Sequence, residues 1–148
     1  MVRRLARRAL VAGLLIGTAA LARADDAGVR DAGPYRVHYN ALPADEIAPA
    51  MAERHGLPTT PGHCVVSVAV EHRASGTPVA AMASGEITRP DGRMRPLDLR
   101  EMRVDDRVYY VAAVPLDGAL RLRFELKVSP AGDMPPETIR FSRSFGDR

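Results

Sequence analysis

The sequence predicts an all-β fold, an immunoglobulin-like antiparallel β-sandwich of about seven strands with a short helical piece near the mature N-terminus. Apolar and polar side chains alternate along several runs, most clearly in ALRLRFELKV at 119–128. Such alternation is typical of a half-buried strand, because successive side chains of an extended chain point to opposite faces. Turn residues separate the runs at intervals of about ten residues, as in sandwiches. A small barrel is the alternative.

The first 24 residues have the organisation of a secretory signal peptide. Four arginines lie within residues 1–8, residues 9–21 are apolar, and Ala-Arg-Ala at 22–24 fits a cleavage site. The apolar run is shorter than the roughly 17 to 25 residues that span a bilayer. We therefore expect cleavage after Ala24, no stable membrane anchor and a periplasmic location. The general export route is favoured over the twin-arginine route, because the residues after the arginine pairs do not extend that pattern.

The intact mass of the exported protein tests this cleavage site. We expect a mature chain that begins at Asp25, directly after the small-x-small triplet. A mass that retains the first 24 residues would contradict cleavage, whereas a cut one or two residues away would correct only the boundary.

Loss of the signal peptide changes the charge balance of the chain. The full sequence has 21 basic and 18 acidic residues and a net charge of +3, and five of the basic residues lie in the signal peptide. The mature chain therefore holds 16 basic against 18 acidic residues, a charge of −2, which gives no reason to expect binding to nucleic acid or to an anionic membrane. Cys64 is the only cysteine, so stability must come from packing rather than from a disulfide.

The mature chain begins with residues 25–33, which are polar and contain Gly, and we expect a flexible leader there. A single sandwich domain is expected over 34–148, a length that suits one core. The segments between its apolar runs contain Gly, Pro and Asp, which favour tight turns. The expected strands are 34–40, 63–72, 78–88, 94–103, 107–114, 120–128 and 138–145.

The stretch HYNALPADEIAPAMAERHGL is the one part of the chain with a helical pattern. Pro43 and Pro49 suit first helical turns, where a missing N–H costs nothing, and Gly56 suits the position just past a helix end. Ile47 and Met51 stand four apart and share a face. We expect two short turns that cover the open end of the sandwich.

Two strands carry further information. In HCVVSVAVEH, Cys64 alternates with valines on one face, so its thiol is expected to be buried and slow to react. The run RVYYVAAVPL is apolar on both faces, as in a central strand that is covered on both sides or buried against a partner. Tyr109 and Tyr110 point to opposite faces, so we expect one in the core and the other free to anchor a partner.

Several stretches resemble a protein family. They are VHYNAL, the helical piece ending in GL, and above all three blocks in fixed order: LDLREM at 97–102, VYY at 108–110 and LRFEL at 122–126, with RFSRSF near the end. Together they resemble the bacterial family of domains of unknown function numbered 4426. The resemblance implies a small exported single-domain protein without an established activity, and it transfers no functional residues.

A metal site has little support in the sequence. There is no His-x-His, no histidine pair at helical spacing and no Cys/His cluster. Met51, His55 and Cys64 could together hold copper in the periplasm, because thioether, imidazole and thiolate are soft ligands. That site requires the fold to bring the three together, and we favour capping and surface roles for these residues.

Catalytic patterns are also weak. The acidic residues Asp98, Glu101, Asp105 and Asp106 alternate with arginines, as on an exposed sheet face. No serine lies in a G-x-S-x-G elbow. The basic stripe Arg121, Arg123 and Lys127 is interrupted by Glu125 and is better read as a solvated face than as a site for an anionic envelope polymer.

We therefore expect an exported accessory or interaction module without catalysis of its own. Its expected partner is another periplasmic or cell-envelope protein, and no catalytic, cofactor-binding or metal-binding residue is assigned. A periplasmic copper-handling protein is the second hypothesis, and a cell-envelope hydrolase is the third.

Overall fold

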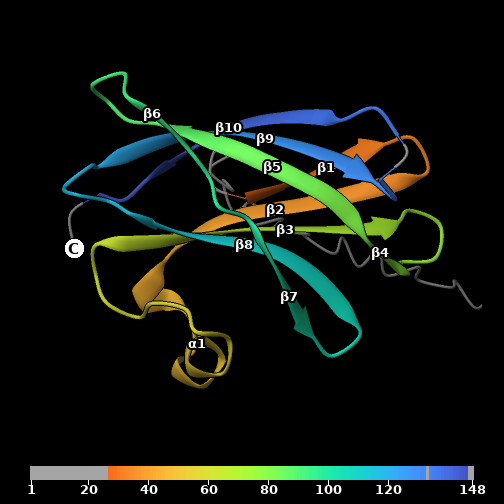
Figure 1. Ribbon diagram of the computed structural model, residues 1–148, viewed down its shortest axis with the longest axis horizontal. Coiled ribbons are helices and arrows are strands. Elements are labelled where there is room, and N and C mark those ends of the chain that lie inside the picture. Colours follow the sequence, from red (N-terminus) through yellow and green to blue (C-terminus); the bar gives the residue numbers. More distant parts are fainter. Residues whose placement is uncertain (1–26, 133, 147–148) are drawn as a thin grey trace, which may run out of the picture.

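Two antiparallel sheets pack face to face in the computed structural model, which describes residues 27–132 and 134–146 (Figure 1). The predicted signal peptide lies outside the described residues. Sheet A has the order β1 (Ala27–Ala32), β2 (Tyr35–Pro43), β3 (His63–His72), β8 (Arg107–Pro115) and β7 (Arg100–Val104), with β4 (Pro78–Val79) also paired to β3. Sheet B has the order β10 (Glu137–Ser144), β9 (Arg121–Pro130), β5 (Ala81–Thr88) and β6 (Met94–Pro96).

This strand order confirms the predicted immunoglobulin-like sandwich. The order β2-β3-β8-β7 corresponds to strands A, B, E and D of an immunoglobulin domain, and β10-β9-β5-β6 corresponds to G, F, C and C′. Strand β1 adds one more strand beside β2. Every pairing between the described strands is antiparallel.

The core lies between the two sheets and follows the period of two. Phe124 on β9 is 2% exposed and stacks on Phe141 of β10 with ring centroids 4.8 Å apart. Arg123, its neighbour on the same strand, is exposed. The largest fully buried side chains between the sheets come from both of them: Val37, Cys64, Val66, Val68, Ile87, Leu122, Phe124, Leu126, Val128, Pro130 and Ile139.

Two predicted strands are each divided between the sheets. The expected strand 78–88 is β4 of sheet A and β5 of sheet B, and the expected strand 94–103 is β6 of sheet B and β7 of sheet A. Sandwich corners arise where the chain bends from one sheet to the other. The bend at Ala80 takes one residue and the bend at 97–99 takes three, too few for a separate loop to be recognised in the sequence.

The predicted flexible leader is wrong for residues 27–32, which form β1. This strand pairs with β2 in a hairpin whose turn places Gly33 at φ 59°, a conformation that favours glycine. Asp31 of β1 accepts a hydrogen bond of 2.9 Å from Arg36 of β2. The side chains of Val29, Arg30 and Asp31 are all exposed, so the strand has no buried face that an apolar alternation could reveal.

The helical piece forms where the prolines and glycine predict it, but it covers a different surface. After the 3-10 turn η1 (Ala44–Glu46), helix α1 (Pro49–His55) begins with proline and ends at Gly56, whose φ is 63°. Instead of closing the end of the sandwich, the segment packs on the outer face of sheet A, below β3 and β8 in Figure 1. The buried contacts there involve Ala44, Val65 and Val111.

Cys64 lies in the core with its side chain fully buried, as the alternation predicts. Burial raises the pKa of this thiol to about 12. We expect iodoacetamide at pH 8 to alkylate native Cys64 roughly a thousandfold more slowly than an unfolded thiol, because each unit of pKa lowers the reactive thiolate tenfold. Timed alkylation followed by mass spectrometry, with and without urea, measures this ratio. Complete labelling of the folded protein within minutes would contradict the burial.

Candidate functional site

An apolar hollow, which we name the α1 groove, lies on the outer face of sheet A beside helix α1. Its volume is about 190 Å³. The strand register explains its floor, because Leu42 pairs with Val65, Ser67 with Val111, and Met102 with Tyr109, all on one face of the sheet. The groove is lined by Leu42, Ile47, Met51, Leu57, Val65, Ser67, Met102, Val104, Tyr109 and Val111.

The groove remains accessible because α1 is too short to cover the sheet. Val65 and Val111 form a floor that is only 6% and 1% exposed. The surrounding Ile47, Leu57, Met102 and Tyr109 are partly buried and keep exposed surface. Arg100 of β7 donates a hydrogen bond to the carbonyl of His55 and so holds the end of α1 beside β7. The groove therefore has a buried apolar floor and partly exposed side walls that a bound ligand can contact.

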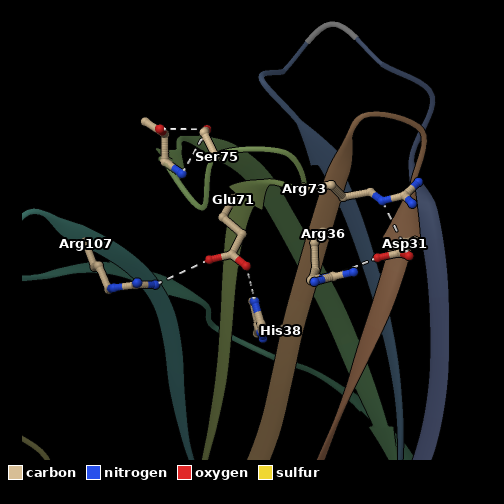
Figure 2. Close-up of polar contacts among 8 residues, drawn as sticks. Asp31, Arg36, His38, Glu71, Arg73, Ser75 and Arg107 are labelled. Atoms are coloured by element: carbon tan, nitrogen blue, oxygen red, sulfur yellow. Dashed lines mark hydrogen bonds and ion pairs between the residues drawn. The ribbon is translucent and has the colours of Figure 1, made fainter.

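A row of charged side chains lies on the same outer face, at the other end of the strands (Figure 2). Glu71 of β3 is 2.9 Å from His38 Nε2 on β2 and 3.6 Å from the guanidinium of Arg107 on β8. Asp31 contacts Arg36 at 2.9 Å and Arg73 at 3.5 Å. We name these six residues the cationic row, because three arginines and a histidine face two carboxylates.

The carboxylates of the cationic row are already stabilised within it. The hydrogen bond with His38 holds the pKa of Glu71 below its usual range. The hydrogen bond with Arg36 does the same for the pKa of Asp31. The side chain of Glu71 is 16% exposed, against 43% for His38 and 48% for Arg107. At the Glu71 contact, therefore, the guanidinium of Arg107 is more exposed to solvent than the carboxylate.

The α1 groove and the cationic row form one continuous surface. Tyr109 of the groove and Arg107 of the row are two residues apart on β8, and therefore about 7 Å apart on one face of the strand. Val104, which lines the groove, pairs directly with Arg107. Ser67 of the groove and Glu71 of the row also lie on one face of their strand, β3, four residues apart. A ligand that lies along these strands would meet an apolar hollow first and then cations.

Two of the three hollows that are larger than the α1 groove have a different chemistry. One, of about 530 Å³, lies where the turns before β3 meet the end of β10, and its lining includes Asp45, His63 and Arg143. The other, of about 570 Å³, lies on the outer face of sheet B, and its lining includes Glu86 and Arg140. Both mix acidic and basic side chains, so neither favours one class of ligand. The lining of the α1 groove has no charged residue.

The structure does not bring together the three residues considered as copper ligands. The thiol of Cys64 points into the sandwich core, whereas Met51 lines the groove on the opposite face of sheet A. His55 is the last residue of α1 on that outer side. Within 27–132 and 134–146, no group of three or more His, Cys, Asp or Glu side chains could hold a metal ion.

The acidic residues considered for catalysis are spread over separate elements. Glu101 of β7 pairs with Arg103 of the same strand at 2.8 Å, and both are exposed. Asp105 and Asp106 form the turn between β7 and β8, and Asp98 lies in the bend before β7. On the outer face of sheet B, Glu125 pairs with Arg140 at 2.8 Å. The basic stripe Arg121, Arg123 and Lys127 lies there and is exposed.

The two tyrosines of β8 separate as the alternation predicts. Tyr110 is 8% exposed and its hydroxyl accepts a hydrogen bond of 2.8 Å from the backbone N–H of Ala81, so it belongs to the core. Tyr109 lines the α1 groove. Two sequence signals lead to the groove: the apolar pattern on both faces of this strand, and the shared face of Ile47 and Met51, which both line it. Nothing in the sequence identifies Met102, Val104 or the Glu71 contacts as parts of the same surface.

Comparisons with known proteins identify similar sequences and folds. A family described as "Domain of unknown function (DUF4426)" matches residues 29–146. A crystal structure of a DUF4426 family protein from Pseudomonas aeruginosa is 28% identical, with a TM-score of 0.70, over 82% of this chain and 97% of that one. Among curated proteins, none matches the sequence.

Two structures of FetP from uropathogenic Escherichia coli strain F11 have a similar fold. A copper-bound variant is 10% identical with a TM-score of 0.56, over 81% of this chain and 95% of that one. The protein as isolated is 11% identical with a TM-score of 0.57, over 82% of this chain and 94% of that one. These likenesses concern the fold. No helix among the described residues has the length and apolar character needed to cross a membrane.

Proposed function

Because the chain belongs to the DUF4426 family, whose function is unknown, we propose a function from its surface: an exported periplasmic module that binds a protein partner through the α1 groove and has no catalysis of its own. The export and the location rest on the residue pattern of the first 24 residues.

The α1 groove is the observation that carries this proposal. Contiguous apolar surfaces rimmed by polar groups are typical of interaction sites. Methionine and tyrosine are enriched where proteins meet, since they combine contact area with adaptability. Met51, Met102 and Tyr109 all line this groove. The two carboxylates of the cationic row are paired with their neighbours and do not converge on a cleft, so the surface supports binding rather than chemistry.

Photo-crosslinking in the native host tests the proposal. Replacing Tyr109 by p-azidophenylalanine keeps an aromatic ring in the groove and adds a reactive group of short reach. We expect one discrete protein adduct from position 109 and none from the same residue placed at Lys127, on the outer face of sheet B. Equal adducts from both positions, or none from position 109, would contradict partner binding at the groove.

Copper handling remains the second candidate because one observation favours it. Met51 and Met102 both line the α1 groove, and thioethers are ligands that select Cu(I). A competition titration of Cu(I) against bicinchoninate tests this function. Loss of copper binding in a Met51→Leu, Met102→Leu double variant, but not in a Met82→Leu, Met94→Leu control, would support it. Equal copper binding by the unsubstituted protein and both double variants would exclude the groove as a copper site.

A further inference from the structure

We propose that the partner binds through an extended acidic peptide segment, which places one aromatic or large apolar side chain in the α1 groove and a carboxylate, two residues along, against Arg107. This inference rests on the proposed function and specifies the chemistry of the partner. It follows from the size of the groove, the spacing between the groove and the cationic row, and the charge that the row exposes.

The size of the groove favours a single side chain. An engineered apolar cavity of about 150 Å³ accepts benzene, so the 190 Å³ of the α1 groove suits one aromatic ring or a comparable aliphatic side chain. An amphipathic helix docks through several anchors at positions i, i+3, i+4 and i+7 and needs a longer trough. The single hollow therefore fits a segment with one anchor.

The spacing of the surface favours an extended segment. Side chains i and i+2 of an extended peptide point to the same side, about 7 Å apart. Tyr109 and Arg107 have the same separation on β8, and both lie on the outer face of sheet A. A peptide that places its anchor beside Tyr109 therefore brings its i+2 side chain close to Arg107.

The charge of the surface favours a carboxylate at that position. Arg107 contacts Glu71 at 3.6 Å, beyond ordinary hydrogen-bond length, while His38 makes the closer contact of 2.9 Å. The guanidinium has five N–H donors, and the Arg107 side chain is 48% exposed. It can therefore pair with a second carboxylate, whereas a lysine at the same position of the partner would meet the guanidinium of Arg107.

Peptide fluorescence tests the inference directly, because the protein contains no tryptophan. The acidic probe is acetyl-Gly-Ser-Trp-Ser-Asp-Ser-Gly-amide, and a matched probe carries lysine in place of aspartate. Entry of the indole into the groove shifts its emission to shorter wavelength. We expect the acidic probe to bind the mature protein at least fivefold more tightly than the lysine probe in low salt. High salt should remove most of this difference.

Four variants assign the two contacts. Met102→Glu should weaken both probes more than tenfold, and Arg107→Gln should reduce the preference for the acidic probe to less than twofold. Met82→Glu and Arg123→Gln make the same substitutions at exposed positions of sheet B, and both should leave binding unchanged. Far-UV circular dichroism and thermal melts confirm that each variant is folded.

The outcomes separate this inference from the proposed function. Equal binding of both probes, with loss in Met102→Glu, would overturn the acidic segment and leave partner binding at the groove intact. No binding of either probe would overturn the inference, and the crosslink from position 109 would still decide the proposed function. Displacement of 1-anilinonaphthalene-8-sulfonate from the groove by decanoate, but by neither peptide, would overturn the peptide assignment. Dimerisation of the protein would also overturn it if the Met102→Glu substitution abolished the dimer.

Discussion

Replacing Phe124 by Ala is expected to lower the free energy of unfolding by roughly 3 to 5 kcal/mol, the usual cost of truncating a buried aromatic side chain. Phe124 is 2% exposed, and its ring stacks on that of Phe141. It lies between Leu122 and Leu126, which are fully buried on the same face of β9. The smaller side chain would leave a cavity that these neighbours cannot fill, because both sheets are held by their pairing. Urea melts followed by far-UV circular dichroism measure the loss.

The matched control is Arg123→Ala, one residue away on the same strand. The Arg123 side chain is exposed on the outer face of sheet B, and exposed substitutions usually stay within about 0.5 kcal/mol. The two variants share one strand and nearly one local sequence, so their difference isolates the face to which each side chain points. Equal losses at the two positions would contradict the burial of Phe124.

The strands that could be predicted from the sequence are those with a clear apolar pattern, whether one face is buried, as in β9, or buried residues lie on both faces, as in β3 and β8. β9 alternates over most of its length, and β3 was predicted with the bounds that the structure has, His63–His72. In β9, burial of one face leaves a period of two in the sequence, whereas β3 and β8 show nearly continuous apolar runs. The family resemblance, which rests on blocks in β8 and β9 and before them, is confirmed by the family match over 29–146.

The parts that could not be predicted depend on how strands associate. β1 exposes most of its side chains, so it is held by backbone pairing to β2, which leaves no apolar pattern. The two sheet changes, at Ala80 and at 97–99, take only one and three residues, so the segment stays extended while the partner strands change. Local sequence specifies that a segment is extended, but its partner strand is determined by the whole core.

The candidate site, too, could be predicted only in part, because it depends on how separate strands associate. One of Tyr109 and Tyr110 was predicted to face outward as a partner anchor because β8 is apolar on both faces, and Tyr109 is the one that lines the α1 groove. The groove itself forms only because α1 docks on sheet A rather than on the end of the sandwich. His38, Glu71 and Arg107 lie on three different strands, and only the register of β2, β3 and β8 brings them together.

Replacing Arg89 by Met is expected to destabilise the domain by roughly 2 to 4 kcal/mol, since hydrogen bonds to charged groups and unsatisfied acceptors each contribute on this scale. Arg89 follows β5 of sheet B and is 6% exposed. Its guanidinium donates to the carbonyl oxygens of Leu116 and Pro115 at 2.7 and 2.8 Å, at the end of β8 in sheet A. One buried side chain thus ties the ends of both sheets together, a role that the turn sequence RPDGR does not reveal.

The third contact of Arg89 provides the control. Its guanidinium is 3.1 Å from the carboxylate of Asp117, whose side chain is 61% exposed, so water screens this ion pair. Asp117 has a φ of 48°, and asparagine tolerates this left-handed conformation as well as aspartate does. Asp117→Asn should therefore cost less than about 1 kcal/mol. Urea melts of both variants compare the two contributions. If Asp117→Asn destabilised the domain as much as Arg89→Met, the ion pair rather than the two carbonyl contacts would hold this end of the sandwich.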